Sequence, residues 1–596
     1  MKLIPYHCVT LRGGYLFEKQ EMNTHAAIPA VYDRFYETGR ITAFKFGYPE
    51  KDPIRPHIYW DSDVAKWMES VAYVLQKGPN PDLEAKVEEL VDDIERNQGE
   101  DGYFNIYYTV VEPHGRWTNR DWHELYCAGH LFEAAVAYAE ATGRTRFLTC
   151  MEKYADYIYR VFVEEQSAAF KTPGCEEIEL ALIRMYRYTG KRKYLDLAEH
   201  FLTIRGSVEE PGNDINRQSH KPIGEQFEVE GHAVRAMYLC TGLAYLAAET
   251  GDEKLVEQVK ALWEDTATRK MYVTGGLGST YIGEAFTTPY DLPADQAYTE
   301  TCAGIAFCFF SNGMLALDNH ARYADAVERA LYNGVISGVS MEGNRFFYEN
   351  PLEINLSERY ANSFGARRFP AHRRVACFDC SCCPPNINRL LASLGNYLYG
   401  TEGNTLYVNQ FIASELKTDG MTATLDTDYP RQGKVTITAD GVAEIAIRIP
   451  AWCEKFTIDA PYLMENGYAR VRNRGTPVTV DFDLSPRRVW ADRRVLRAAA
   501  QTAILRGPVV YCAEGVDNGE GELHNYLIPK AFSAETEGSE AYGLPTLTVP
   551  CMKRVDDGPL YSNRPPEYVP AILRLIPYNA FANREETDMR VWFFTE

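Results

Sequence analysis

Long apolar runs are missing from the 596-residue sequence, in which no stretch approaches the ~18 apolar residues of a transmembrane helix. The opening residues, Met1 to Arg12, lack the apolar segment of about 7–15 residues and the small-residue cleavage site of a signal peptide. We therefore expect no membrane span, no signal peptide and a cytoplasmic protein. In that compartment the 14 cysteines are expected to be thiols or metal ligands rather than disulfides.

Basic charge is also scarce. Lys and Arg number 62 against 83 Asp and Glu, which gives a formal net charge of −21 at pH 7. Without a basic cluster to neutralise phosphates, the sequence argues against nucleic acid and anionic membranes as partners. The glycine-rich stretch from Val273 to Glu284 contains no G-x-x-x-x-G-K-[ST] pattern and has no strand–helix context. A phosphate loop and a dinucleotide-binding fold are therefore excluded.

Aromatic residues, in contrast, are abundant: 40 Tyr, 27 Phe and 8 Trp. Aromatic faces line sugar-binding clefts, but they also fill large hydrophobic cores, and composition leaves both interpretations open. The chain is too long for a single core, so several domains are expected.

The segment from about residue 53 to residue 399 has its apolar residues at helical spacing. Three predicted helices end at Gly143, Gly190 and Gly251, and each is followed by a polar turn and a new apolar run. This pattern indicates a degenerate repeat of helical hairpins. Long inserts rich in glycine and aromatics separate the helices and would collect at one end of a closed toroid. We therefore favour a closed toroid over an open solenoid.

After Leu406 the apolar period changes from the helical value to alternation, as in Val435–Thr438, Ile445–Ile449 and Val478–Leu484. Short alternating segments separated by Gly, Pro and Asp predict a β-sandwich. The expected fold class is α+β multidomain. We expect a helical domain over residues 1–402, a β-sandwich over 403–512, and over 513–596 either a second small β region or the completion of the sandwich.

The candidate chemistry centres on the stretch Cys377–Asn386, which holds four cysteines within seven residues. A bond between the neighbours Cys382 and Cys383 would be strained. The pair Pro384–Pro385 predicts that no helix continues directly after them. Glu300 and Cys302 could complete a tetrahedral Cys3Glu zinc site, although the spacing is not that of a zinc finger. The residues alone leave metal binding and buried free thiols equally open.

Each of the other candidate site residues carries only a weak signal on its own. Glu284 and Glu300, sixteen positions apart, could form a glycosidase carboxylate pair. His130 and His232 each follow a glycine near the start of a predicted helix, where a hydrogen-bonded core histidine is the ordinary interpretation. Tyr348 is by default a core aromatic residue.

Five sequence segments together resemble glycoside hydrolase family 127, the β-L-arabinofuranosidase family, from about residue 5 to residue 510. They are Trp122-His-Glu-Leu-Tyr-Cys-Ala-Gly-His130, Glu230-Gly-His232-Ala-Val-Arg-Ala, Glu284, Thr299-Glu300-Thr-Cys302-Ala and Cys382-Cys383-Pro-Pro-Asn386. The resemblance implies an (α/α)6 barrel catalytic domain followed by β-sandwich modules. It also implies an enzyme that removes terminal β-L-arabinofuranosyl units from oligosaccharides with retention of configuration.

The resemblance further assigns roles to individual residues. It implies that Zn2+ is bound by Glu300, Cys302, Cys382 and Cys383. It implies that Cys382 is the nucleophile, that Glu284 is the general acid/base, and that His130, His232 and Tyr348 contact the sugar. Cys175 stands where family members commonly carry a sugar-contacting histidine. Cys377 and Cys380 enrich the stretch before the paired cysteines and are not among the implied ligands.

Three alternatives stay open at this point. Because Cys175 replaces a sugar-contacting residue, the substrate could be a modified or acidic furanoside of pectin. A sugar epimerase of the same helical class would work through histidines without zinc. A sugar-binding protein with a structural zinc would bind arabinosides without turnover. A homodimer through the C-terminal β region is predicted from family likeness.

Overall fold

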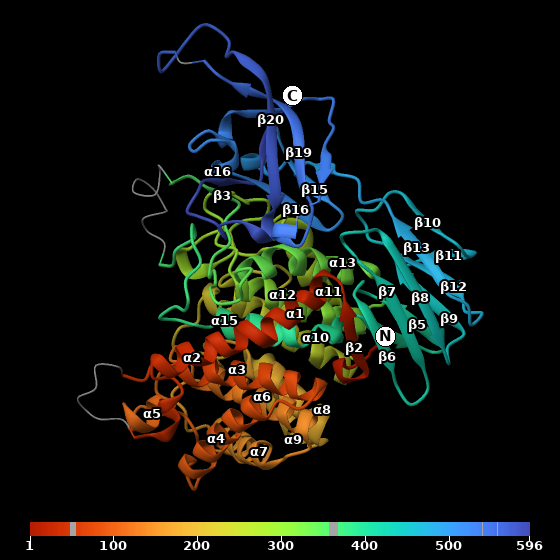
Figure 1. Cartoon of the computed structure of the whole chain (residues 1–596). Coiled ribbons are helices and arrows are strands. Elements are labelled where there is room, and N and C mark those ends of the chain that lie inside the picture. The colour runs from red at the N-terminus through yellow and green to blue at the C-terminus, as the bar shows by residue number, and fades with distance from the viewer. Residues whose placement is uncertain (48–54, 357–367, 539, 557) are drawn as a thin grey trace.

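The computed structural model describes residues 1–47, 55–356, 368–538, 540–556 and 558–596. It combines a helical region with three β-sheets (Figure 1). The predicted combination of a helical domain with β domains is therefore confirmed. Within the described residues, no helix has both the length and the apolarity to cross a membrane.

Six helices form a closed ring, because each packs against the next and the last packs against the first. In ring order they are α3 (Trp60–Lys77), α6 (Glu124–Thr142), α8 (Ile178–Thr189), α10 (Ala233–Thr250), α12 (Thr301–Leu317) and α15 (Cys383–Ala392). Most residues of these helices are buried, around their whole circumference. A helix that is buried on all sides belongs in the interior of a helical assembly.

A second set of helices covers the ring. These are α4 (Pro81–Asn97), α7 (Arg146–Tyr159), α9 (Arg192–Ile204), α11 (Glu253–Asp265) and α13 (Ala321–Ala330), together with α1 (Tyr15–Met22) and α2 (Ile28–Glu37). Each of them buries only one face, as amphipathic helices do. Two short helices, α5 (Tyr107–Val110) and α16 (Gly515–Asn518), lie in connections.

The predicted helix ends are confirmed at three glycines. Gly143, Gly190 and Gly251 follow the last residues of α6, α8 and α10, with φ angles of 71°, 71° and 68°. Glycine adopts this left-handed conformation without the steric cost that other residues pay, so it ends a helix and reverses the chain into the next one.

Two six-stranded sheets lie beside the helical region on the right in Figure 1. The first has the order β1 (Lys2–Leu3), β4 (Tyr399–Glu402), β5 (Thr405–Val408), β9 (Glu444–Arg448), β12 (Tyr468–Arg472), β11 (Tyr462–Glu465). The second has the order β10 (Phe456–Ile458), β13 (Val478–Phe482), β8 (Lys434–Asp440), β7 (Thr422–Thr427), β6 (Ala413–Lys417), β2 (Val9–Gly13). The N-terminal strands β1 and β2 thus pair with strands that lie about four hundred residues later.

The third sheet has ten strands and lies above the helices in Figure 1. Its order is β14 (Arg487–Val489), β15 (Gln501–Arg506), β22 (Phe593–Thr595), β17 (Tyr526–Ile528), β19 (Thr546–Arg554), β20 (Tyr568–Pro577), β16 (Val509–Glu514), β21 (Met589–Arg590), β3 (Glu353–Ile354), and β18 (Glu535–Glu537) pairs with β19. The boundary expected at residue 512 falls inside β16, so strand pairing does not divide the chain there.

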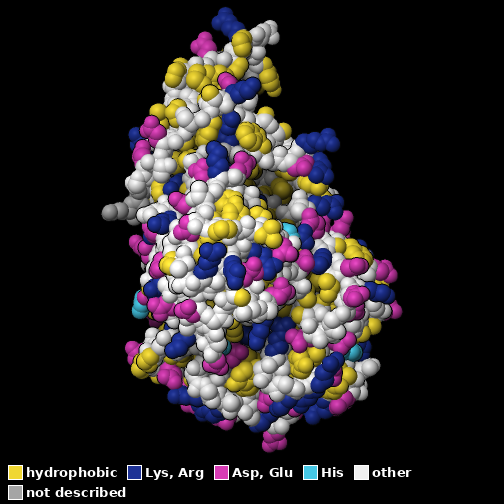
Figure 2. Space-filling view, turned by 90° about the vertical axis from the view of Figure 1, so that its right-hand side faces the viewer, with side chains coloured by type: hydrophobic (Ala, Val, Ile, Leu, Met, Phe, Trp, Pro, Cys, Tyr) yellow, Lys and Arg dark blue, Asp and Glu magenta, His cyan; other side chains and the backbone are white. Residues whose placement is uncertain are grey.

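One face of the molecule is shown in Figure 2, where acidic and basic side chains are interspersed over most of the surface. Apolar side chains gather at the upper end of this view. The connection between β19 and β20 carries strongly exposed apolar residues, among them Leu560 and Tyr561 at 88% and 87% exposure.

Candidate active site

A pocket of about 280 Å³ lies where the N-terminal ends of the ring helices meet. Its wall is formed by Tyr59, Ser62, Asp63, His123, Tyr126, Cys175, Asn216, His232, Val234, Arg235, Gly283, Glu284, Glu300, Cys302, Tyr348, Arg368, Cys380 and Cys382. Most of these residues belong to the first turns of α3, α6, α10 and α12 or to the inserts that precede those helices. The ring therefore brings the long inserts to one end, as the sequence predicts.

Three sulfur atoms and a carboxylate converge at this pocket. The Cys302 Sγ lies 3.4 Å from the Cys383 Sγ, and the Cys382 Sγ lies 3.8 Å from it. The Glu300 Oε1 lies 3.7 Å from the Cys382 Sγ and 3.8 Å from the Cys383 Sγ. Residues from two neighbouring ring helices, α12 and α15, therefore place four donor atoms within 4.8 Å of one another.

The prediction that the two prolines prevent a helix after the cysteines is wrong. Helix α15 begins at Cys383 and includes Pro384 and Pro385 in its first turn. Proline is tolerated there because the first amides of a helix have no intrahelical acceptor, and its fixed φ suits the helix. The prolines thus start α15 directly at the paired cysteines and hold both thiols at the mouth of the ring.

The acid–base properties of the four donors fit a bound cation. Burial raises the pKa of Glu300, and the neighbouring Cys382 adds to the effect. Burial also raises the pKa of Cys383. Burial would raise the pKa of Cys302 as well, but hydrogen bonds from Cys382 and Cys383 lower it to about 6. Four acidic groups this close cannot all ionise without a compensating positive charge. The Glu300 Oε2 is buried and has no hydrogen-bond partner among the described residues. The cluster can therefore hold a metal ion.

Glu284 lies beside this cluster in a strained turn, with a φ of 53° after Gly283 at 71°. Its carboxylate lies 3.1 Å from the His232 Nε2. The His232 Nδ1 accepts a hydrogen bond from the Val234 amide at 3.2 Å and caps α10. The Nε2 therefore carries the proton and donates to Glu284.

These contacts determine the protonation of the pair. Burial lowers the pKa of His232, so its ring is neutral. Burial would raise the pKa of Glu284, but hydrogen bonds from His232 and Tyr298 outweigh it and hold the pKa of this carboxyl below its ordinary value. The carboxylate form of Glu284 is therefore stabilised by its surroundings.

Tyr348 and Cys175 both line the pocket. The Tyr348 hydroxyl lies 3.4 Å from the Cys382 Sγ and 3.9 Å from the Cys380 Sγ. Burial raises the pKa of Cys175 to about 12, against the opposing effect of Arg235. Cys377 contacts the Ser381 hydroxyl and does not line the pocket.

His130 is not in the pocket wall, so the structure does not support a direct sugar contact for it. Its ring is fully buried, 3.2 Å from Glu177 and packed against Tyr126. His123 lines the pocket instead, at the residue before α6. His123 has a left-handed backbone directly before α6, whereas His130 lies about two turns inside that helix. The sequence signal for His123 was its place directly before a ring helix.

The pocket at the mouth of the helical ring thus gathers a carboxylate, a neutral histidine, thiols and aromatic side chains, a set of groups that can carry out acid–base and nucleophilic chemistry. Family models match almost the whole chain: "Beta-L-arabinofuranosidase, GH127 catalytic domain" at residues 8–396, the corresponding middle domain at 405–482 and the C-terminal domain at 486–594. The chain belongs to glycoside hydrolase family 127, which confirms the predicted family.

Individual relatives agree with this assignment. The chain is 36% identical to a non-reducing end β-L-arabinofuranosidase of Bifidobacterium longum subsp. longum, over 91% of this chain and 90% of the relative. It is 37% identical to the crystal structure of a β-L-arabinofuranosidase from Geobacillus stearothermophilus T6, with a TM-score of 0.93, covering 99% of this chain and 100% of that one. A solved β-arabinofuranosidase of the same family is 30% identical, with a TM-score of 0.90, over 100% of this chain and 98% of that one.

Proposed function

We propose that this glycosidase releases terminal β-L-arabinofuranosyl units from oligosaccharides with retention of configuration. The observation that carries the proposal is the convergence of Cys382, its three neighbouring donors and Glu284 at one pocket. The names of the related enzymes support the sugar. We also propose that the closed ring and its outer helices form an (α/α)6 barrel. A pocket of about 280 Å³ that ends inside the ring suits a single terminal sugar better than an internal chain segment.

Glu300, Cys302, Cys382 and Cys383 would hold Zn2+, whose preference for tetrahedral sulfur and oxygen donors matches this set. When bound, zinc would keep the thiols ionised at neutral pH. Cys382 lines the pocket and is the most exposed of the three thiols, whereas Cys302, also in the wall, and Cys383 are both buried. The Cys382 sulfur is therefore the nucleophile.

The first step forms a bond between the Cys382 sulfur and the anomeric carbon and breaks the bond from that carbon to the leaving oxygen. Only enzyme in which Glu284 is protonated enters this step, and Glu284 gives its proton to that oxygen. In the second step Glu284 takes a proton from water, which attacks the anomeric carbon and releases the sulfur. Two inversions give net retention, with the thiolate in place of the second carboxylate of an ordinary retaining glycosidase.

The sugar would be oriented by His232, Tyr348 and His123, and Cys175 lines the same pocket. The Tyr348 hydroxyl is close to the Cys382 sulfur and can bond the same sugar face that the sulfur attacks. Burial lowers the pKa of His123 to about 3, so its neutral ring can donate and accept hydrogen bonds with sugar hydroxyls.

The test is hydrolysis of an aryl β-L-arabinofuranoside by Cys382→Ala and Glu284→Gln. Each variant is expected to lose hydrolysis while its circular dichroism spectrum stays unchanged, and wild-type protein is expected to contain about one zinc per chain. Cys377→Ala, close in sequence but outside the pocket, is the matched control and should retain activity. Full activity in either site variant would refute the role of that residue. An enzyme that is fully active without metal would refute the zinc assignment.

A furanoside with an acidic group is a second candidate, favoured by two guanidinium groups in the pocket wall. Arg235 contacts Cys175, and its buried Nε has no hydrogen-bond partner among the described residues. Arg368 lines the outer wall and is exposed. Comparing kcat/KM for plain and carboxylate-bearing aryl furanosides decides between the candidates. A higher kcat/KM for the carboxylate-bearing furanoside that is lost in Arg368→Gln would favour the second candidate.

A further inference from the structure

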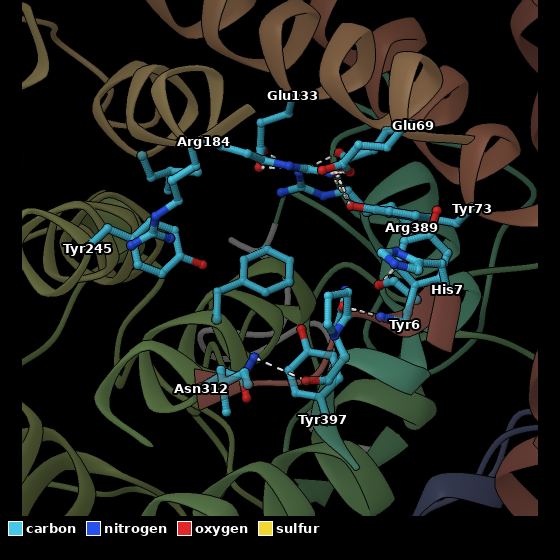
Figure 3. A pocket seen from close by; sticks show the side chains of 18 of the residues that line it. Tyr6, His7, Glu69, Tyr73, Glu133, Arg184, Tyr245, Asn312, Arg389 and Tyr397 are labelled. Carbon is cyan, nitrogen blue, oxygen red and sulfur yellow. Dashed lines mark hydrogen bonds and ion pairs between the residues drawn. The ribbon is translucent and has the colours of Figure 1, made fainter. Parts of the chain in front are cut away.

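A second cavity, of about 410 Å³, lies at the opposite end of the ring of helices (Figure 3). It is lined by later residues of the same helices whose first turns form the active site, such as Tyr73 of α3, Arg184 of α8 and Tyr245 of α10. The segments 3–7 and 393–397 close it from outside. Its volume is within the range of ligand-binding pockets, roughly 300–1,000 Å³.

A hydrogen-bonded layer separates the two cavities. The Arg389 guanidinium contacts Glu69 at 2.8 Å and Glu133 at 2.6 Å, and it donates to the Tyr238 hydroxyl at 3.1 Å. Beyond this layer, the buried rings of Tyr238 and His130 pack edge to face as far as Tyr126 in the active-site wall. The second cavity is therefore a separate compartment and not an extension of the active site.

Every guanidinium that faces the second cavity is paired with a carboxylate. Arg184 contacts Glu69 at 2.6 Å and Glu133 at 3.3 Å, and it lies 3.7 Å from Glu140. Arg187 is paired with Glu249 at 2.6 Å. Every guanidinium of the wall is thus paired, so the cavity offers no free positive charge to an anionic ligand. We therefore favour a neutral ligand, whose hydroxyl groups can also donate to the carboxylates.

The remaining wall combines aromatic rings with hydroxyl and amide groups. Figure 3 shows Tyr245, Asn312 and Tyr397 around the cavity, across from the paired Arg184 and Glu133. The Tyr245 and Tyr397 hydroxyls have no hydrogen-bond partner among the described residues, although Tyr397 is only 5% exposed. The Asn312 amide makes one long hydrogen bond, of 3.5 Å, to the Asn396 carbonyl. Flat apolar faces beside unsatisfied hydroxyl and amide groups suit a molecule with ring C–H faces and several hydroxyls.

We propose that this second cavity binds a neutral sugar, a monosaccharide or a short oligosaccharide, at a site distinct from the active site. The proposal goes beyond the hydrolysis of furanosides and does not depend on which furanoside is hydrolysed. The sugar stacks on the tyrosine rings and accepts and donates hydrogen bonds through Tyr245, Tyr397 and Asn312.

The test begins with crystals of the wild-type protein soaked in L-arabinose, with glycerol-soaked crystals as the reference. Sugar density is expected in the second cavity, stacked against a tyrosine ring. An empty or water-filled cavity in crystals whose active site holds the sugar would overturn the proposal.

A titration followed by NMR then measures the affinity in solution. Tyr245→Phe removes one hydroxyl and keeps the ring, so it should weaken binding at the second site about fivefold, the effect of one typical hydrogen bond. Tyr188→Phe, a tyrosine of α8 that is 40% exposed and does not line the cavity, is the matched control and should bind as the wild type does. Asn312→Trp, which fills the cavity, should abolish binding there and leave furanoside hydrolysis intact. Equal affinities in wild type, Tyr245→Phe and Asn312→Trp would place the binding elsewhere and refute the site. No saturable binding to the wild type would mean binding at crystal concentration only, and would refute the site as well.

Discussion

The contact between His232 and Glu284 makes the pH dependence of the enzyme predictable. His232 has two separable functions: its Nδ1 caps helix α10, and its Nε2 donates to Glu284 at 3.1 Å. The substitution His232→Asn keeps the first function, because Asn is among the best N-capping residues. It removes the second, because the Asn side chain is too short to reach the carboxylate.

The size of the effect follows from the hydrogen bond. A hydrogen bond to a charged group contributes about 1.5–3 kcal/mol, and one pKa unit corresponds to about 1.36 kcal/mol. Losing the bond should therefore raise the pKa of Glu284 by about one to two units. The first step needs protonated Glu284, so kcat/KM falls as pH rises through this pKa. The alkaline limb of the profile should consequently move about one to two pH units higher in the variant.

The assay is kcat/KM for an aryl furanoside across the pH range, measured on wild type, His232→Asn and a control. His320→Asn is the matched control, because His320 caps α13 with the same Nδ1 geometry, to the Arg322 amide, far from the pocket. If His232 only contacted the sugar, its loss would lower kcat/KM at every pH and leave the alkaline limb at the same pH. An alkaline limb that stays in place in His232→Asn would refute the argued role of the His232 proton.

Three further predictions concern stability and the metal. Burial raises the pKa of Glu124 to about 8, above its unfolded value of about 4.3, so the stability that this group adds is complete below the unfolded pKa and is lost as pH rises through 8. The loss amounts to at most about 1.4 kcal/mol of unfolding free energy per pH unit, and it should be absent in Glu124→Gln, whose amide does not titrate. Identical urea midpoints for variant and wild type from pH 6 to pH 9 would contradict this prediction. Arg389→Met leaves Glu69 and Glu133 as buried carboxylates without a cation, so it should destabilise the helical region by about 3–5 kcal/mol in denaturant titration; a change under 1 kcal/mol would show that the layer does not need the cation. A chelator should remove activity and lower Tm, and zinc but not magnesium should restore both; recovery with magnesium would argue against the thiolate set.

Features with a local sequence signal could be predicted. The glycines after α6, α8 and α10 mark helix ends because left-handed backbone favours glycine whatever the tertiary context. The family resemblance predicted that Glu300, Cys302 and the paired cysteines form one site. The structure places all four donor atoms within 4.8 Å of one another.

Two kinds of feature could not be predicted: the pairing of strands that are far apart in the sequence, and how deeply a side chain is buried in the ring. Strands β1 and β2 are short and join sheets built almost entirely from residues after 398, and no local pattern specifies that pairing. The resemblance pointed to His130 through its local motif, and a local motif does not show that this ring is fully buried while His123 lines the pocket. The second cavity arises only when six helices close into a ring, because its walls come from segments that are far apart in the sequence.

The central claim is that the sulfur of Cys382 forms a covalent bond with the sugar. Glu284→Gln incubated with an aryl β-L-arabinofuranoside that has a good leaving group should still form the intermediate and hydrolyse it slowly, because water then lacks its base. Rapid quenching and peptide mass spectrometry should find a pentosyl group on the peptide that contains Cys382, and none after Cys382→Ala. A pentosyl group on a carboxylate, or no adduct during steady turnover, would contradict the account.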